Sequence, residues 1–314
     1  TMIEISHLTK KFDQFVAVDD LSLSIREGEV LGFLGPNGAG KSTTMKVITG
    51  FLSPSSGRVI IDGHDISSAA LEAKRLIGYL PEGAPSYGDM TTLEFLRFIA
   101  QVRGFRGVEI GQKVDQVINE VALQTVRDQS IETLSKGFKR RVGLAQAIMH
   151  DPKVLILDEP TDGLDPNQKH HVRALIKSLA ADKIVIISTH ILEEVTAVCS
   201  RAVIIANGKI VADGTPSELE SQSRFHRAIR VTLTDSHDLV ADLATLPGVA
   251  SVEVEENNRL AYTIFAEGGA SIFSKVSEIA QQKHWPISEF HVERGQLEEV
   301  FRSVTQQSEG QTDE

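Results

Sequence analysis

The amino-acid sequence predicts an α/β fold followed by a smaller α+β domain. Three continuous apolar runs, Val30–Leu34, Val154–Leu157 and Ile184–Ile187, have the character of strands that are buried on both faces of a sheet. A glycine-rich segment leads from the first run directly into a helical pattern that begins at Thr44. After Leu219 the pattern changes to short alternating strands and helices, which indicates a second domain. The length of 314 residues is compatible with one large domain or two domains.

The glycine-rich segment near the N-terminus predicts a binding site for a nucleoside triphosphate. It follows an early strand, Ile3–Ile5, and the apolar run to Leu34, and it consists of Gly35, Pro36, Asn37, Gly38, Ala39, Gly40, Lys41, Ser42 and Thr43. Glycines let successive backbone N–H groups turn inward around a phosphate, and the following helix N-terminus adds partial positive charge. The Lys41 ammonium can reach the terminal phosphate oxygens, and the Ser42 hydroxyl can ligate Mg²⁺.

Two amphipathic helices are predicted between this loop and the second apolar run. Thr91 and Glu94 have the spacing of a capping box, which marks the start of the first helix. A second helical pattern covers Val114–Leu123. The stretch Glu82–Asp89 that precedes them has the composition of a surface loop.

Two carboxylates end the second apolar strand and predict hydrolytic chemistry. Asp158 is placed to hold a Mg²⁺ shell, and Glu159 to orient and polarise an attacking water. The segment Leu134–Phe138 before this strand leads into a helix, and Asp162–Asp165 follows it. The third strand then ends in the polar residues Ser188, Thr189 and His190.

The order and spacing of these segments resemble the nucleotide-binding subunit of an ATP-binding-cassette (ABC) transporter over about residues 2–222. By this resemblance the glycine-rich loop is the Walker A motif, and Asp158 and Glu159 close the Walker B strand. The resemblance also implies that Leu134–Phe138 is the signature motif, whose Ser135 and Gly137 contact the nucleotide bound to a partner subunit. It implies that Asp162–Asp165 is the D-loop, with Asp165 at the nucleotide, and that His190 is the switch histidine. Phe12 is then the aromatic residue that stacks on adenine, and Val18 is the apolar residue beside it.

The same resemblance implies a P-loop ATPase core with an N-terminal β-subdomain and a helical subdomain at about residues 83–145. It implies a subunit that binds and hydrolyses ATP with Mg²⁺, dimerises on ATP and powers a transmembrane permease. Glu82 replaces the usual glutamine of the Q-loop, and Lys136 and Phe138 replace residues of the usual signature. Both replacements also occur in type-2 ABC exporters, so export is expected. Ser42, Asp158 and Glu82 are the expected metal ligands.

Several of these residues have simpler structural interpretations. His190 can be a structural histidine at the end of a buried strand, and Phe12 can be a core aromatic. Ser135 and Gly137 can cap the helix that follows, which is compatible with their functional role. The basic residues at positions 136, 139, 140 and 141 are expected on a solvated or membrane-facing surface.

The C-terminal region is predicted to form its own domain at residues 223–305. Residues Ser221–Ser223 have the composition of a linker, and the order β-α-β-β-α-β that follows suggests a small ferredoxin-like domain. Residues 223–314 hold 8 Lys and Arg against 15 Asp and Glu, a net charge of −7, which disfavours nucleic-acid binding. The polar tail, residues 306–314, is predicted to be disordered.

The resemblance implies a peripheral protein at the cytoplasmic face of the membrane, held there by the permease, and the composition agrees with a soluble subunit. No apolar stretch approaches the ~20 residues that span a bilayer, and the single cysteine, Cys199, is compatible with a reducing compartment. Two alternatives remain open at this stage: a soluble ABC ATPase that acts on a nucleic-acid or ribosomal partner, and a regulatory ATP-binding protein. Ribosomal members usually carry two cassettes in one chain, and DNA-repair members carry a long coiled coil; neither feature is found in this sequence.

Overall fold

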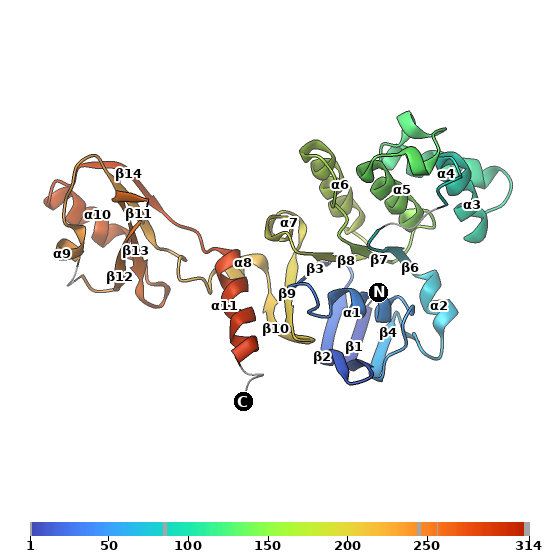
Figure 1. The fold of residues 1–314 in the computed structure, drawn as a ribbon, viewed down its shortest axis with the longest axis horizontal. Helices are drawn as coiled ribbons and strands as arrows, with labels where there is room; N and C mark the ends of the chain where they lie inside the picture. Colours follow the sequence, from blue (N-terminus) through green and yellow to red (C-terminus); the bar gives the residue numbers. More distant parts are fainter. Residues whose placement is uncertain (1, 84–86, 244–245, 256, 311–314) are drawn as a thin grey trace. The chain divides into compact units, whose positions relative to one another are not determined.

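The protein folds as two compact units, Thr1–Thr215 with Gln307–Glu314 and Pro216–Gln306 (Figure 1). The structure is a computed structural model, and it describes residues 2–83, 87–243, 246–255 and 257–310. The expected boundary after residue 222 is wrong, because helix α8 (Pro216–Glu220) belongs to the second unit. Ser223, expected in a linker, is buried, and its hydroxyl oxygen accepts a hydrogen bond from the Phe225 N–H.

The first unit contains two sheets. An antiparallel sheet has the strand order β2-β1-β4-β5, and a six-stranded sheet has the order β10-β9-β3-β8-β7-β6. The strands are β1 (Met2–Phe12), β2 (Phe15–Arg26), β3 (Val30–Leu34), β4 (Ser56–Ile61), β5 (His64–Asp65), β6 (Ile77–Leu80), β7 (Val154–Asp158), β8 (Ile184–Thr189), β9 (Arg201–Ala206) and β10 (Lys209–Gly214). The first predicted strand, Ile3–Ile5, therefore continues to the hairpin at Phe12.

The three apolar runs form the centre of the six-stranded sheet, as their composition predicts. Every residue of β3, β7 and β8 is buried. The strands pair in parallel in the order β3-β8-β7, with Leu34 opposite Thr189 and Asp158 opposite Ser188. Their carboxyl ends therefore meet at one edge of the sheet, where open α/β sheets bind their ligands.

Helices cover the sheets and form a separate group in the first unit. The helices are α1 (Lys41–Ile48), α2 (Ala70–Arg75), α3 (Thr92–Val102), α4 (Val108–Glu120), α5 (Lys136–Ile148), α6 (Pro166–Leu179) and α7 (Leu192–Val198). Helices α3, α4 and α5 contact one another and lie together in Figure 1. The predicted capping box is present, because the Thr91 hydroxyl oxygen accepts from the Glu94 N–H and a Glu94 carboxylate oxygen accepts from the Thr91 N–H.

Two expectations for this helical group need comment. Helix α4 begins at Val108, ahead of the predicted start at Val114. Residues 84–86 of the expected loop Glu82–Asp89 lie outside the described residues.

After helix α8, the second unit has the element order β-α-β-β-α-β followed by a helix. Its elements are β11 (Ile229–Leu233), α9 (Leu239–Leu243), β12 (Val249–Glu255), β13 (Asn258–Ala266), α10 (Phe273–Gln282), β14 (Ile287–Val292) and α11 (Leu297–Gly310). The strands pair antiparallel in the order β12-β13-β11-β14 over an apolar core that includes Trp285 and Val276.

The C-terminal tail differs from its prediction. Helix α11 continues to Gly310, so residues 306–310 are helical where disorder was expected. Residues 311–314 lie outside the described part of the chain. Across the described ranges, no helix combines the length and apolar character needed to cross a membrane.

Candidate active site

The glycines of the loop Gly35–Thr43 are required by close packing and by backbone conformation. A Cβ atom on Gly40 would lie 2.4 Å from the Ala17 carbonyl oxygen, and one on Gly35 would lie 2.4 Å from the Ile205 carbonyl oxygen. Gly40 also has a φ of 105°, which side-chain-bearing residues rarely adopt. The neighbouring segments therefore hold the loop in one conformation at the start of α1.

Lys41 lies buried inside this loop. Its ammonium group donates hydrogen bonds to the carbonyl oxygens of Gly35 (2.7 Å) and Pro36 (3.1 Å). Burial lowers the pKa of Lys41, while the carboxylates of Glu159, Asp158 and Glu82 raise it. An ammonium has three N–H donors, so these two bonds leave one donor for an anionic ligand. The backbone N–H groups of α1 that precede Thr44 are further donors for such a ligand, because the first intrahelical hydrogen bond is donated by the Thr44 N–H.

Asp158 has the environment of a cation ligand. It is buried at the end of β7, and its Oδ1 accepts a hydrogen bond from the Ser188 hydroxyl. Its Oδ2 is buried and has no hydrogen-bond partner among the residues that the structure describes. Buried carboxylate oxygens are normally paired or bound to a metal, so this oxygen is suited to Mg²⁺ or to a water in its shell.

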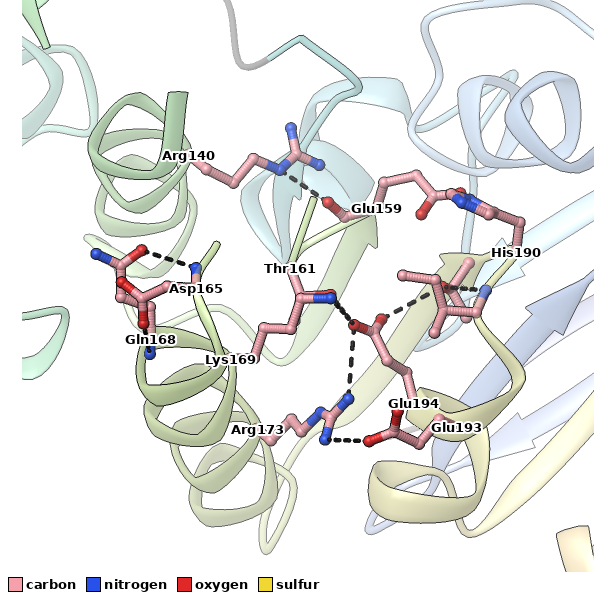
Figure 2. Close-up of polar contacts among 12 residues, drawn as sticks. Arg140, Glu159, Thr161, Asp165, Gln168, Lys169, Arg173, His190, Glu193 and Glu194 are labelled. Atoms are coloured by element: carbon pink, nitrogen blue, oxygen red, sulfur yellow. Dashed lines mark hydrogen bonds and ion pairs between the residues drawn. The ribbon is translucent and has the colours of Figure 1, made fainter. Parts of the chain in front are cut away.

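Glu159 and His190 form a contact at the same edge of the sheet. His190 Nδ1 and Glu159 Oε1 are 2.8 Å apart, and the two side chains point toward each other in Figure 2. Burial raises the pKa of Glu159, whereas the hydrogen bond and charge of His190 and the charge of Lys41 lower it. Glu159 has a φ of 51°, a conformation that turns the chain out of the β7 strand direction. The structure thus brings together the predicted base and the predicted switch histidine.

Arg140 on α5 joins this edge to the end of β6. Its guanidinium donates from Nε to the Glu159 carbonyl oxygen (2.9 Å) and from Nη1 to the Pro81 carbonyl oxygen (2.7 Å). Burial lowers the pKa of Arg140, and the nearby carboxylates, Asp158 first among them, raise it. Arg141 is also buried and donates to the carbonyl oxygens of Val121 and Ala122. The expectation that these two arginines lie on a solvated or membrane-facing surface is therefore wrong.

The signature residues cap α5 and lie apart from the Walker A loop of their own chain. Ser135 is the N-cap, and its hydroxyl oxygen accepts a hydrogen bond from the Phe138 N–H (3.3 Å). A Cβ atom on Gly137 would lie 2.9 Å from Gln168 Oε1, so glycine allows close packing against the start of α6. Figure 1 shows α5 and α1 on opposite sides of the six-stranded sheet.

The D-loop packs against the start of α5. Lys136 Nζ and Asp162 Oδ2 are 2.6 Å apart, and their hydrogen bond lowers the pKa of Asp162. Asp165 is the N-cap of α6, with a capping box formed with Gln168 (Figure 2). In this structure the Asp165 carboxylate thus serves its own helix.

The two residues expected at the adenine differ in accessibility. Phe12 lies at the end of β1 with 43% of its surface exposed, which excludes a core aromatic, and Lys10 Nζ lies 5.0 Å from its ring centroid. Val18 is completely buried in the hydrophobic core. The expectation that Val18 offers an apolar contact to the nucleotide is therefore not met, because its side chain is used in packing β2.

Glu82 is exposed and follows the end of β6. Its charge acts on Lys41 and on Arg140, so it belongs to the electrostatic environment of the site. In the described part of the chain, no group of three or more His, Cys, Asp or Glu residues is arranged to hold a metal. A Mg²⁺ ion here would therefore depend on few protein oxygens together with phosphate oxygens and water, as is usual for this ion.

Four residues that contact this site were not assigned roles from the sequence: Arg140, Thr161, Ser188 and Glu194. Ser188 stands beside Asp158, and Glu194 accepts a hydrogen bond from the Thr161 hydroxyl. One sequence signal was available for Glu194, because it lies four positions before the buried Val198 and so shares a helical face with it. A carboxylate on an apolar helix face is normally paired.

Comparison with known proteins decides the family. Residues 18–162 match the family described as ABC transporter. The chain is 33% identical over 307 residues to the linearmycin resistance ATP-binding protein LnrL of Bacillus subtilis (strain 168), which covers 97% of this chain and 98% of that protein. The chain belongs to the ABC transporter family.

Two further comparisons concern the cassette alone. The chain is 38% identical over 224 residues to the probable multidrug ABC transporter ATP-binding protein YbhF of Escherichia coli (strain K12), covering 71% of this chain and 39% of that protein. This chain thus matches about two-fifths of the length of YbhF. A solved ATP-binding subunit of an ABC transporter superposes with a TM-score of 0.66 at 30% identity, covering 71% of this chain and 93% of that one. The predicted α/β cassette fold is confirmed by this likeness.

Proposed function

We propose that the chain hydrolyses Mg²⁺-ATP as a homodimer and thereby drives a membrane permease, with export as the direction of transport. The observation that carries this proposal is the meeting of Lys41, Asp158, Glu159 and His190 at one edge of the six-stranded sheet. The names of the relatives LnrL and YbhF, which concern linearmycin resistance and multidrug transport, support export.

In the proposed reaction, Glu159 accepts a proton from the water that attacks the γ-phosphorus, and the bond between that phosphorus and the ADP oxygen breaks. The loop Gly35–Thr43 presents backbone N–H groups and the Lys41 ammonium to the negative charge of the phosphates. His190 shares a hydrogen bond with Glu159 through Nδ1, which leaves Nε2 for a hydrogen bond to the γ-phosphate. Phe12 is exposed where it can stack on the adenine.

The residues that would hold Mg²⁺ are Asp158, Ser42 and Glu82. The unpartnered, buried Oδ2 of Asp158 supports the first assignment. Ser42 is the second residue of α1 and lies at the helix terminus where the phosphates would bind. When bound, the ion neutralises charge on the transferred phosphoryl group.

The purified full chain is expected to release phosphate from ATP when Mg²⁺ is present. EDTA should stop this release, and Lys41→Ala should weaken ATP binding, because that change removes the buried ammonium from the loop. Phosphate release and ATP binding by fluorescence are the measurements, with Lys46→Ala on the same helix as the matched control. Phosphate release that persists in EDTA would contradict the proposal.

Glu82→Gln is expected to change turnover by less than about tenfold. An amide oxygen ligates Mg²⁺ much as a carboxylate oxygen does, so the change removes one exposed negative charge near Lys41 and keeps a ligand. The turnover number for Mg²⁺-ATP, measured together with the Mg²⁺ concentration at half-maximal rate, checks this. Complete loss of turnover would show that the charge itself is required.

Dimerisation is proposed because one chain holds two halves of a site in different places. The Walker A loop opens α1, whereas Ser135 and Gly137 lie at the start of α5 across the sheet. Two copies in opposite orientation can place the α5 N-terminus of one chain at the phosphates bound to the other, where its N–H groups favour an anion.

The proposal also covers the role of the C-terminal unit and the location of the chain in the cell. The element order β-α-β-β-α-β and the strand order β12-β13-β11-β14 support a ferredoxin-like module that regulates or assembles the dimer. A permease partner places the chain at the cytoplasmic face of the membrane.

A further inference from the structure

Glu194 is a buried carboxylate that contacts the segment after Glu159 and the end of β8 before His190. It lies on α7, and 5% of its side chain is exposed. Its Oε1 accepts a hydrogen bond from the Thr161 hydroxyl, and its Oε2 accepts one from the Thr189 hydroxyl at 3.3 Å. Figure 2 shows Glu194 between the segment with Thr161 and the strand end that leads to His190.

The two threonines are close in sequence to the two residues of the proposed catalytic pair. Thr161 follows Glu159 by two positions, and Thr189 immediately precedes His190. The Thr189 hydroxyl oxygen also accepts the backbone N–H of Ile191 at 3.0 Å. One carboxylate therefore fixes the backbone next to both members of the 2.8 Å contact between Glu159 and His190.

Helix α6 supplies the positive charge that compensates this buried carboxylate. Arg173 Nη2 lies 3.8 Å and Lys169 Nζ lies 4.0 Å from Glu194 Oε1. A buried carboxylate is costly unless it is paired and hydrogen-bonded, and here both oxygens are used. Because the N-cap of α6 is Asp165 of the D-loop, the contacts of Glu194 connect the D-loop, the end of β8 and α7.

We propose that Glu194 is a positioning residue that sets the geometry of the Glu159–His190 pair. It acts through the hydroxyl groups of Thr161 and Thr189 and touches neither the nucleotide nor the attacking water. This inference rests on the proposed ATP hydrolysis. We expect Glu194 to affect the rate of the chemical step and not the binding of ATP, because the loop Gly35–Thr43 makes none of these contacts.

The first test is Glu194→Gln in the full chain. Glutamine has the same shape, but it presents one acceptor oxygen and one donor group where two acceptors are needed. Small displacements of catalytic groups cost up to about 100-fold, so kcat for Mg²⁺-ATP should fall about 10- to 100-fold. The KM for ATP, and ATP binding measured without Mg²⁺, should stay within about threefold, since binding and chemistry are separate here.

Glu193→Gln is the matched control. Glu193 precedes Glu194 on α7 and contacts the same arginine, with its Oε1 3.2 Å from Arg173 Nη1, but its side chain is 77% exposed. The control removes the same charge from the same helix without touching either threonine, so its kcat should equal that of the parent.

A second pair of variants tests the hydrogen bond from the Thr161 hydroxyl to Glu194 and leaves the charge of Glu194 unchanged. Thr161→Val keeps the shape and removes the hydroxyl, and Thr161→Ser keeps the hydroxyl. We expect kcat to fall at least about fivefold in the valine variant and to be restored in the serine variant. Because this pair does not alter Glu194 itself, it decides the question even where Glu194→Gln fails to fold.

Three results would overturn the inference: parental kcat in Glu194→Gln, a loss of ATP affinity equal to the loss of kcat, or equal rates in Thr161→Val and Thr161→Ser. A parent chain that hydrolyses no ATP would instead contradict the proposed function. The two failures are therefore distinguishable in the same set of measurements.

Discussion

Glu159→Gln is expected to bind Mg²⁺-ATP with parental affinity and to hydrolyse it about 10²- to 10⁴-fold more slowly. Glutamine keeps the size of the side chain and a hydrogen-bonding partner for His190, but its amide cannot accept the proton of the attacking water. Single-turnover phosphate release and ATP binding by fluorescence separate the two quantities. Glu109→Gln, an exposed carboxylate in the first turn of α4, is the control and should hydrolyse at the parental rate.

The expected separation of binding from turnover follows from where Glu159 lies. Its hydrogen-bond partners are His190, Ser188, Arg140 and Asp162, and it acts on Lys41 only through its charge, whereas the loop Gly35–Thr43 is held by Ala17, Ile205 and its own glycines. Hydrolysis at the parental rate by Glu159→Gln would show that another group takes the proton.

Arg140→Met is the second change with a large expected effect, on stability as well as on turnover. It removes the donor of the part-buried Pro81 carbonyl oxygen, leaves the Glu159 carbonyl oxygen with only the Asp162 N–H, and removes the buried positive charge near Asp158, at a total cost of about 3–5 kcal/mol. A loss of this size lowers Tm by on the order of 10 °C in a chain of this length. Turnover should fall as well, because the backbone of Glu159 is no longer held against α5.

The control for Arg140→Met is its neighbour on the same helix. Lys139 is less buried, and its Nζ donates to the Glu132 carbonyl oxygen at 2.9 Å. Lys139→Met removes a charge and one hydrogen bond at the surface, so Tm should change by less than about 2 °C. If the two changes lower Tm equally in a thermal unfolding experiment, the buried contacts of Arg140 contribute no more to stability than the surface contact of Lys139.

The features that could be predicted from the sequence are those set by local composition. The apolar runs predicted β3, β7 and β8, and the Thr91–Glu94 spacing predicted the start of α3. The glycine-rich segment predicted a tight loop at the start of α1, because the backbone conformation is set by glycines within nine consecutive residues. Its role as a phosphate site stays a prediction.

The features that were missed depend on contacts between distant parts of the chain. Buried Arg140 donates hydrogen bonds to carbonyl oxygens that lie 59 and 19 positions away in the sequence. No local sequence pattern distinguishes it from the more accessible Lys139. Val18 is buried because a second sheet and the loop at Gly40 pack around β2. Glu194 is matched with hydroxyls and cations that come from other elements of the fold.

The end of the chain shows a different kind of error. Residues 306–314 are polar, which predicted disorder, yet α11 continues to Gly310. Gln and Glu are good helix formers and the helix has already been nucleated, so it can continue where an isolated peptide would not fold.

The central claim is that ATP joins two copies of this chain, so that each site combines Lys41 of one copy with Ser135 of the other. Light scattering of the Glu159→Gln chain, with and without saturating Mg²⁺-ATP, tests it most directly. We predict a monomer of 34.3 kDa without nucleotide and twice that mass with ATP. Adding Ser135→Arg, which places a bulky cation at the α5 N-terminus, should keep the mass at 34.3 kDa under both conditions. A mass that stays monomeric at saturating ATP, or a dimer unaffected by Ser135→Arg, would contradict the composite site.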